Sequence, residues 1–167
     1  ERVKTNKTKA IILNSPSNPT GAIYEREELE SIASWAVENN IFVISDELYE
    51  KLIYDGNEHI SIAMLNDDIK ELTILINGMS KAYAMTGWRI GYLAAAEWIV
   101  KGCNKLQGQY TSGPCSVSQM ASLEAYTGSQ EPVEEMRQAF QRRRDLIVKL
   151  AKEIPGLEVN VPEGAFY

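Results

Sequence analysis

Four short apolar runs stand out in the first two thirds of the chain. They cover residues 9–14 (KAIILN), 41–45 (IFVIS), 72–77 (LTILIN) and 89–96 (RIGYLAAA). Each run is apolar at successive positions, which is typical of a strand buried on both faces. We therefore predict four strands of one sheet that is covered by helices.

Apolar residues at helical spacing separate and follow these runs. Residues 25–40 carry them every three or four positions, with three glutamates in the first turn, where the helix dipole favours acidic groups. Residues 97–110, 117–128 and 132–154 are also predicted to be helical. In the last helix, one predicted apolar face is made of Val133, Met136, Phe140, Ile147, Leu150 and Ile154.

This order of elements predicts an α/β fold, with a mostly parallel sheet in a three-layer α/β/α arrangement. The segment between the first two strands is long enough for a crossover, so that pair is expected to be parallel. Only about a dozen residues join the third and fourth strands, which leaves an antiparallel pair open. Residues 157–167 alternate enough to predict a strand of a second unit. The chain begins without methionine and stops there, so we expect a segment of a longer polypeptide.

Composition narrows the class of protein. The 167 residues are 44% hydrophobic and 24% charged, as in ordinary globular proteins. A net charge of -6 disfavours a nucleic-acid binder, and the basic run 142–144 is expected to be solvated surface because its members fan out around a helix. No apolar run approaches the ~18 residues of a membrane span.

The cysteine and histidine content argues against several kinds of site. Cys103 and Cys115 are too far apart for a metal knuckle or redox pair, so we expect reduced thiols in a cytoplasmic protein. His59 is the only histidine, which disfavours zinc hydrolases and histidine-based triads. We predict no metal site.

Polar residues lie just beyond three predicted strands. Asn18 follows the first, Asp46 the second and Lys81 the third, and ligands of parallel sheets bind at such carboxyl ends. A lysine near a dry strand end suits nucleophilic attack on a carbonyl. Arg89, after a glycine and a tryptophan, suits a phosphate or carboxylate.

Each of these residues also has an ordinary structural explanation. Asp46 could cap a helix, and Lys81 could be a surface lysine. Arg89 could form a salt bridge at the rim, and Asn18 could belong to a simple strand-to-helix turn. Taken singly, the four residues leave these alternatives open.

The three segments SNPTG, ISDELY and SKAYAMTGWRIGY, in this order and at these separations, carry a more specific signal. Together they resemble the fold-type-I aminotransferases that use pyridoxal 5'-phosphate, in particular the bacterial aspartate aminotransferase-like group. The resemblance covers essentially the whole chain. It implies that residues 1–130 are the central part of the cofactor-binding large domain, residues 131–155 a connecting helix, and residues 156–167 the start of a small α+β domain.

The resemblance also implies roles for individual residues. Lys81 would form the Schiff base with the cofactor and move the proton at the substrate Cα, and Asp46 would pair with the pyridine nitrogen. Asn18 and Tyr49 would hydrogen-bond the phenolic oxygen of the ring, and Arg89 would hold the phosphate. Relatives often have a cis peptide bond at the step matching Asn18-Pro19.

One departure concerns the phosphate. Many relatives carry a phosphate-binding serine at the position of Gly78, where Ser80 could compensate. The remaining phosphate loop, the aromatic residue that stacks on the ring and the arginine for the substrate carboxylate lie outside this chain. Since a second subunit completes active sites in this family, we expect a homodimer and an isolated segment with little activity.

The function that the resemblance implies is transfer of an amino group from aspartate or a similar amino acid to a 2-oxo acid. The cofactor contacts do not select the fate of the substrate carbanion, so a C–S lyase or a cyclopropane-forming synthase on the same scaffold stays possible. A third alternative is the aminotransferase-like sensor domain of a transcription regulator. Amino acids and 2-oxo acids are the expected partners, without nucleic acid or membrane.

Overall fold

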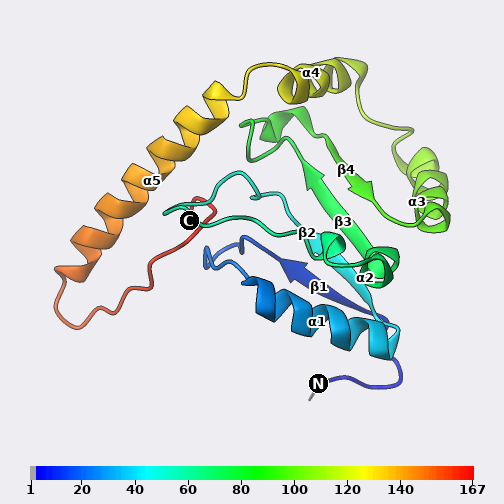
Figure 1. Ribbon diagram of the computed structural model, residues 1–167. Helices are drawn as coiled ribbons and strands as arrows, with labels where there is room; N and C mark the ends of the chain where they lie inside the picture. The colour runs from blue at the N-terminus through cyan, green and yellow to red at the C-terminus, as the bar shows by residue number, and fades with distance from the viewer. Residues whose placement is uncertain (1–2) are drawn as a thin grey trace.

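A four-stranded sheet forms the centre of the computed structural model, which describes residues 3–167 (Figure 1). Its strands, in spatial order, are β1 (Ala10–Asn14), β2 (Phe42–Asp46), β3 (Thr73–Gly78) and β4 (Gly91–Ala94). The first three are parallel and β4 is antiparallel to β3. The α/β class and the mostly parallel sheet are confirmed. The short connection between β3 and β4 cannot hold a crossover helix, which explains the antiparallel pair.

Five α-helices and two 3-10 turns complete the described chain. They are α1 (Arg26–Asn39), η1 (Ile62–Met64), α2 (Asp67–Leu72), η2 (Thr86–Trp88), α3 (Glu97–Tyr110), α4 (Ser116–Thr127) and α5 (Glu131–Lys152). All four predicted helices are present. Between residues 3 and 167, none of the helices combines the length and apolarity that crossing a bilayer requires.

Helix α2 has no counterpart in the sequence-based prediction, which places only a polar connection after Gly56. Its start is capped by Asn66, whose Oδ1 accepts a hydrogen bond from the Ile69 amide at 3.0 Å. The helix has six residues and only Ile69 is buried, so it leaves little periodicity to detect.

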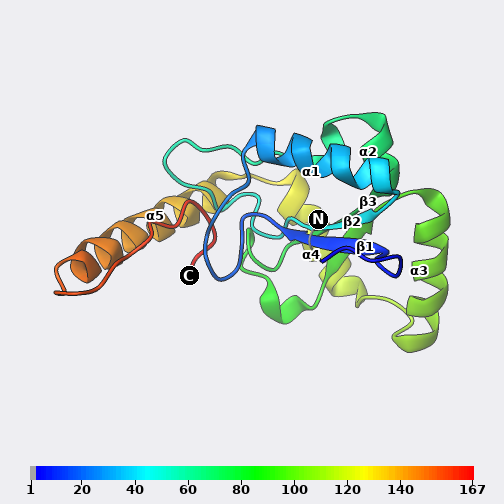
Figure 2. The same ribbon diagram turned by 90° about the horizontal axis from the view of Figure 1, so that it is seen from below.

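The main core lies between the sheet and helices α1 and α2, which cover the same face (Figure 2). Leu29 and Ala33 of α1 pack there against Leu13 and Val43. On the opposite face Ile12 is 77% exposed, and α3 reaches the sheet where Trp98 meets Phe42 edge to face. Helices therefore touch both faces, but only one is fully covered.

The buried row of α5 differs from the predicted apolar face. Val133, Met136 and Phe140 are at least partly buried, but Ile147, Leu150 and Ile154 are exposed. The buried row instead continues with Arg144 and Val148, because steps of four residues from Met136 keep to one side of a helix. The far half of α5 projects away from the sheet (Figure 1).

The run of three arginines at 142–144 shows what this change of buried row means for single residues. Arg142 and Arg143 are exposed, but Arg144 is only 7% exposed. Its guanidinium donates to the Pro162 carbonyl at 2.6 Å and to Asp55 at 2.8 Å. The prediction of solvated surface is therefore wrong for Arg144, which faces the carbonyl of half-buried Pro162 and a carboxylate.

Residues 157–167 form no strand, so that prediction is also wrong. They run back to the loops beside the sheet. There Gly164 makes one isolated bridge with Ile53, and its amide donates to the Gly21 carbonyl at 2.8 Å. A side chain on Gly21 would lie 2.5 Å from Cβ of Pro162, and its φ is +70°. This close approach brings the C-terminal segment to the loop after β1. The division into a large and a small domain stays a prediction.

Candidate active site

The loops after β1, β2 and β3 meet beyond the carboxyl ends of these strands. Asn14, the last residue of β1, joins two of them. Its side-chain Nδ2 donates to the Asp46 carbonyl at 3.2 Å, and its Oδ1 accepts a hydrogen bond from the backbone N–H of Asn18 at 2.7 Å. The Asn18-Pro19 bond is cis, as predicted, and so is Ser15-Pro16. Asn14 therefore sets the distance between the Asn18 loop and Asp46.

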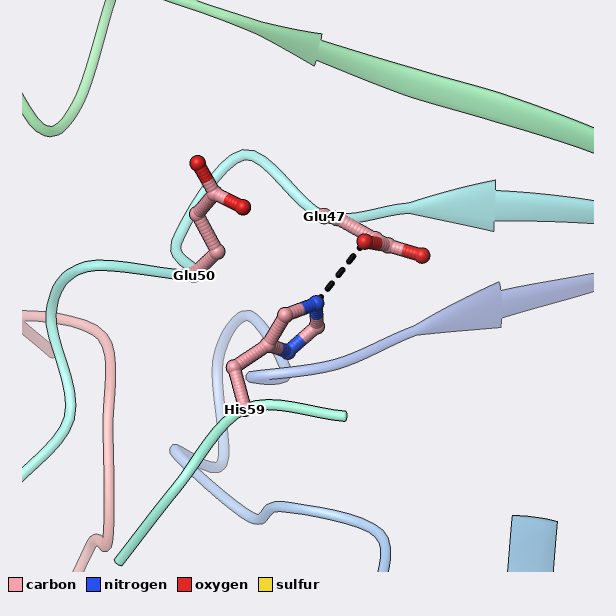
Figure 3. A group of neighbouring side chains, drawn as sticks. All are labelled: Glu47, Glu50 and His59. Atoms are coloured by element: carbon pink, nitrogen blue, oxygen red, sulfur yellow. Dashed lines mark hydrogen bonds and ion pairs between the residues drawn. The ribbon is translucent and has the colours of Figure 1, made fainter. Parts of the chain in front are cut away.

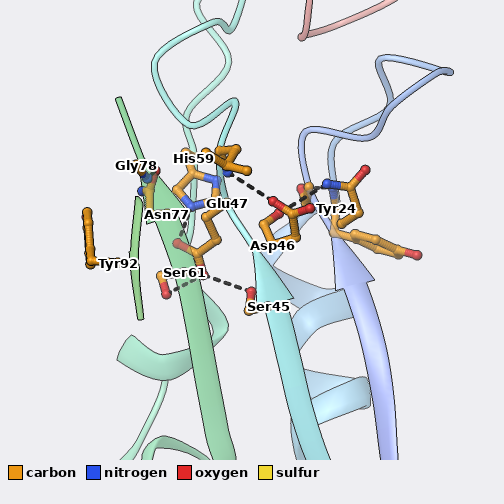
Figure 4. Close-up of polar contacts among 12 residues, drawn as sticks. Tyr24, Ser45, Asp46, Glu47, His59, Ser61, Asn77, Gly78 and Tyr92 are labelled. Carbon is orange, nitrogen blue, oxygen red and sulfur yellow. Dashed lines mark hydrogen bonds and ion pairs between the residues drawn. The ribbon is translucent and has the colours of Figure 1, made fainter. Parts of the chain in front are cut away.

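Asp46 ends β2, and its half-buried side chain points away from the face that carries Ser45 and Glu47 (Figure 4). Its Oδ1 accepts a hydrogen bond of 3.3 Å from the Leu48 amide. The chain after Asp46 forms turns instead of a helix, so this contact is that of an Asx turn and not of a helix cap. Among the described residues, no group is bonded to the other carboxylate oxygen.

Tyr49 lies in that turn and is only 3% exposed. Burial raises the pKa of its hydroxyl, and so does the hydrogen bond of 3.4 Å with the Tyr167 hydroxyl. The nearby charge of Asp46 raises this pKa further, whereas the Asn18 side chain lowers it. The net shift is upward, so Tyr49 keeps its proton at neutral pH. It can therefore act as a hydrogen-bond donor.

Lys81 follows β3 and is half-buried. Its Nζ lies 5.4 Å from the ring centroid of Tyr49 and 5.4 Å from that of Phe166. An ammonium or amine between two aromatic faces is not the solvated head of a surface lysine. The structure thus brings Lys81, Tyr49 and Asn18 together, with the Asp46 carboxylate acting on the same tyrosine.

Arg89 and Ser80 lie on another side of this region. Both line an open hollow of about 1400 Å³ beside β3 and β4. Arg89 is exposed, has a φ of +49° and donates from Nη1 to the Thr86 carbonyl at 2.6 Å. No hydrogen bond or ion pair within residues 3–167 joins it to the other predicted site residues.

Sequence reasoning missed three residues of this region. They are Asn14 and the two aromatic residues at the end of the chain, Phe166 and Tyr167. Phe166 meets Tyr49 edge to face at 5.4 Å and stacks on Phe140 at 5.3 Å. Asn14 could have been noticed as the polar end of an apolar run, but the aromatic pair lies 117 and 118 positions after Tyr49 and has no local signal.

Comparison with known proteins identifies the family. The family model for aminotransferase class I and II matches residues 1–167. The chain belongs to this family. Members of the family use pyridoxal 5'-phosphate as cofactor and act on amino acids and 2-oxo acids.

Similar proteins within the family include several aspartate aminotransferases. The chain is 55% identical to the aspartate aminotransferase of Bacillus sp. (strain YM-2), over 98% of this chain and 42% of that protein. It is 47% identical to the asparagine–oxo-acid transaminase of Streptococcus mutans serotype c, over 100% of this chain and 42% of that protein. The crystal structure of the aspartate aminotransferase from Rhizobium meliloti superposes with a TM-score of 0.94 at 42% identity, over 97% of this chain and 41% of that one. The chain thus spans less than half the length of these relatives.

The residues present fit the family's cofactor chemically. An aldehyde needs a primary amine, which Lys81 supplies beside two aromatic rings. A protonated pyridine nitrogen needs a carboxylate, and one oxygen of Asp46 is bonded by no described group. A phenolate needs donors such as the Tyr49 hydroxyl and the Asn18 amide, and a phosphate needs a cation such as Arg89.

Proposed function

We propose that the protein transfers an amino group from an amino acid, aspartate or a similar one, to a 2-oxo acid. The observation that carries this proposal is geometric: Lys81 Nζ lies 5.4 Å from the ring centroid of Tyr49, and Asn14 joins the Asn18 loop to Asp46 at the neighbouring strand end. The similarity to aspartate aminotransferases supports aspartate as the donor. When bound, pyridoxal 5'-phosphate supplies an electrophilic aldehyde and a ring that accepts electrons from the substrate Cα.

Lys81 would have two tasks in this reaction. Its Nζ is the primary amine that would hold the aldehyde end of the cofactor, and the same atom, once released, would move a proton at the substrate Cα. The two aromatic rings 5.4 Å away restrict where Nζ can lie. Both tasks need an amine with a defined position, which the contacts with the two rings provide.

Asp46 and Tyr49 would bind two different polar atoms of the cofactor ring. The Asp46 carboxylate would keep a proton on the pyridine nitrogen, because a negative charge in hydrogen-bonding range favours the protonated ring. Tyr49, which keeps its own proton because burial raises its pKa, would donate to the phenolic oxygen together with the Asn18 amide.

Arg89 would hold the cofactor phosphate, with Ser80 as a second donor in the same hollow. Its present contact, one bond to the Thr86 carbonyl, leaves the rest of the guanidinium for a phosphate. We further propose a homodimer in the cytoplasm. The two cysteines, neither of which forms a disulfide, agree with a reducing compartment.

The amino donor has a second candidate. Because the Streptococcus mutans relative is named an asparagine–oxo-acid transaminase, asparagine is a reasonable alternative to aspartate. Both donors share the α-amino acid head group and differ only in the charge of the side chain. A direct comparison of the two therefore belongs in the first experiment.

The test is a half-reaction on the full-length protein, which should be purified yellow. Aspartate, asparagine and a panel of other amino acids are added one at a time, and conversion to the pyridoxamine form is followed by absorbance. We expect aspartate to react fastest. Lys81→Ala should lower the rate at least 10²- to 10⁴-fold, the range for loss of a general base, while Lys101→Ala, an exposed lysine on α3, should react like wild type.

Three results would contradict the proposal. A colourless wild-type protein would show that the protein does not bind the cofactor. Release of ammonia and a 2-oxo acid without conversion of the cofactor would indicate a lyase. Equal rates for wild type and Lys81→Ala would show that another group moves the proton.

A further inference from the structure

A buried carboxylate lies next to the proposed site without belonging to it. Glu47 follows Asp46 directly and is only 2% exposed. Its Oε1 accepts hydrogen bonds from the Ser45 hydroxyl at 2.8 Å and from the Ser61 hydroxyl at 2.7 Å (Figure 4). Its Oε2 lies 2.8 Å from Nε2 of His59 (Figure 3). Both oxygens are thus occupied by groups of the chain.

The same cluster could be mistaken for a metal site. Ligand atoms of Glu47, Glu50 and His59 lie within 4.8 Å of one another. However, Nε2 of His59 and both oxygens of Glu47 are already used in hydrogen bonds with each other and with two serines. These contacts explain the cluster without a cation.

The network holds Glu47 in its ionised form. Burial raises the pKa of Glu47, but hydrogen bonds from His59, Ser61 and Ser45 and the charge of His59 outweigh it, so the net pKa lies below the ordinary value. An ionised carboxylate only accepts hydrogen bonds. Both serines and Nε2 of His59 therefore donate to it, and the orientation of all three side chains is defined.

The position of the network in the chain suggests its role. Between Asp46 and Ser61 the chain leaves the sheet, forms the turn that carries Tyr49, and returns to the core. Glu47 fixes the start of this loop segment, since its own amide donates to the Ile76 carbonyl of β3 at 2.9 Å. His59 and Ser61 anchor its end. The carboxylate of Glu47 thus joins the two ends of the loop segment.

We propose that Glu47 and His59 are positioning residues that hold the turn of Asp46 and Tyr49 in the geometry that the cofactor ring needs. Asp46 is the last residue of β2 and Glu47 follows it directly, with the two side chains pointing to opposite sides, so a shift of the backbone here moves both side chains. The hydrogen bonds of Glu47 with His59 and the two serines fix the backbone from one side, and the proposed cofactor contacts of Asp46 lie on the other side. This inference rests on the proposed function for its consequence, but the rigidity of the turn is a property of the chain itself.

The test compares four variants of the full-length protein. His59→Leu removes the donor, and His59→Gln restores an N–H near the same place. Ser61→Ala removes one hydrogen bond and serves if His59→Leu does not fold. Glu50→Gln is the matched control, because Glu50 belongs to the same cluster but its side chain forms no hydrogen bond or ion pair with the others within the described chain.

Three measurements follow on each variant. The first is hydrogen exchange of the amides of residues 46–52 in the protein freed of cofactor, which we expect to be about tenfold faster in His59→Leu. The second is the dissociation constant for pyridoxal 5'-phosphate, which should rise roughly 10- to 100-fold, as is usual when a supporting residue of a site is lost. The third is the pH midpoint of the cofactor absorption change, which should move upward as the Tyr49 contact weakens.

The pattern over the variants decides the proposal. His59→Gln should recover most of all three values, and Glu50→Gln should match wild type. Unchanged exchange in both His59→Leu and Ser61→Ala would overturn the proposal. Faster exchange with an unchanged pH midpoint would also overturn it, since the network would then be merely structural. A wild type that binds no cofactor would instead refute the proposed function, and the exchange data would still show whether the network holds the turn.

Discussion

Arg144 illustrates how the surroundings of a side chain decide what its charge does. Its guanidinium contacts the Pro162 carbonyl, pairs with Asp55 and Asp145, and lies 5.1 Å from the ring centroid of Tyr54. Arg142, two positions earlier, points into solvent. Since the two residues are on the same helix, they allow a comparison in which only burial and partners differ.

We expect Arg144→Ala to lower the free energy of unfolding by about 2–3 kcal/mol, because the half-buried Pro162 carbonyl loses its partner and Tyr54 loses packing. Arg142→Ala, the matched control, should change it by less than about 0.5 kcal/mol. Urea denaturation of the two variants measures both values. Equal values would mean that the Arg144 contacts add nothing to stability.

The same dependence on surroundings limits which site residues the sequence could reveal. Asp46 and Lys81 are detectable because Asp46 ends one parallel strand and Lys81 lies three positions after the end of the next, and ligands bind at such strand ends. Glu47, Ser61 and His59 follow no such rule. Their contacts join residues 12 to 14 positions apart through a turn of irregular shape, and no periodic pattern encodes that geometry.

At the scale of elements, strands and helices differ in how far the sequence defines them. The four apolar runs and the four long helices were predictable because each carries successive apolar residues or apolar residues at helical spacing, even though α3 and β4 contain no buried residue. The C-terminal segment was not, since its alternation suggests a strand but its backbone is used for contacts with Gly21 and Leu52. The offset of the buried row on α5 has the same origin: partners distant in sequence choose which face is covered.

The docking of the C-terminal segment gives a prediction at this scale. Gly21→Ala should cost about 3 kcal/mol of unfolding free energy, because a positive φ disfavours alanine and the new Cβ would meet the Pro162 side chain and the Gly164 carbonyl. Gly56→Ala has a similar φ of +77° but nothing within 4 Å, so it should cost only about 1–2 kcal/mol.

Urea denaturation checks these two energies, and hydrogen exchange of the Ala165 amide checks their cause. That amide donates to the Leu52 carbonyl at 2.9 Å and should exchange faster only in Gly21→Ala. If both variants lost the same stability, the close approach at Gly21 would be unimportant and the backbone conformation alone would explain the cost.

For the molecule as a whole, the buried carboxylate next to the site also couples stability to pH. The chain carries 23 acidic residues against 17 lysines and arginines, so many carboxylates titrate as the pH falls. Most of them are exposed and contribute little. Glu47 is different, because it is buried, its pKa is lowered by its partners, and its proton uptake must break bonds that tie two parts of the chain together.

The sign of this coupling can be worked out from the direction of the shift. A carboxyl group whose pKa is lower in the folded than in the unfolded chain stabilises the fold above the unfolded pKa of about 4.5, and this stabilisation disappears as the pH falls through the folded pKa. Glu47→Gln should therefore be about 1–3 kcal/mol less stable than wild type at pH 7. The difference should shrink steadily below about pH 4.5. Urea midpoints of both proteins between pH 7 and pH 3 measure this difference. Glu134, whose pKa is lowered to about 2 by Arg137 and Gln138, is present in both proteins, so its contribution to the pH dependence cancels. A difference that is independent of pH would show that the Glu47 carboxylate is not ionised in the folded protein.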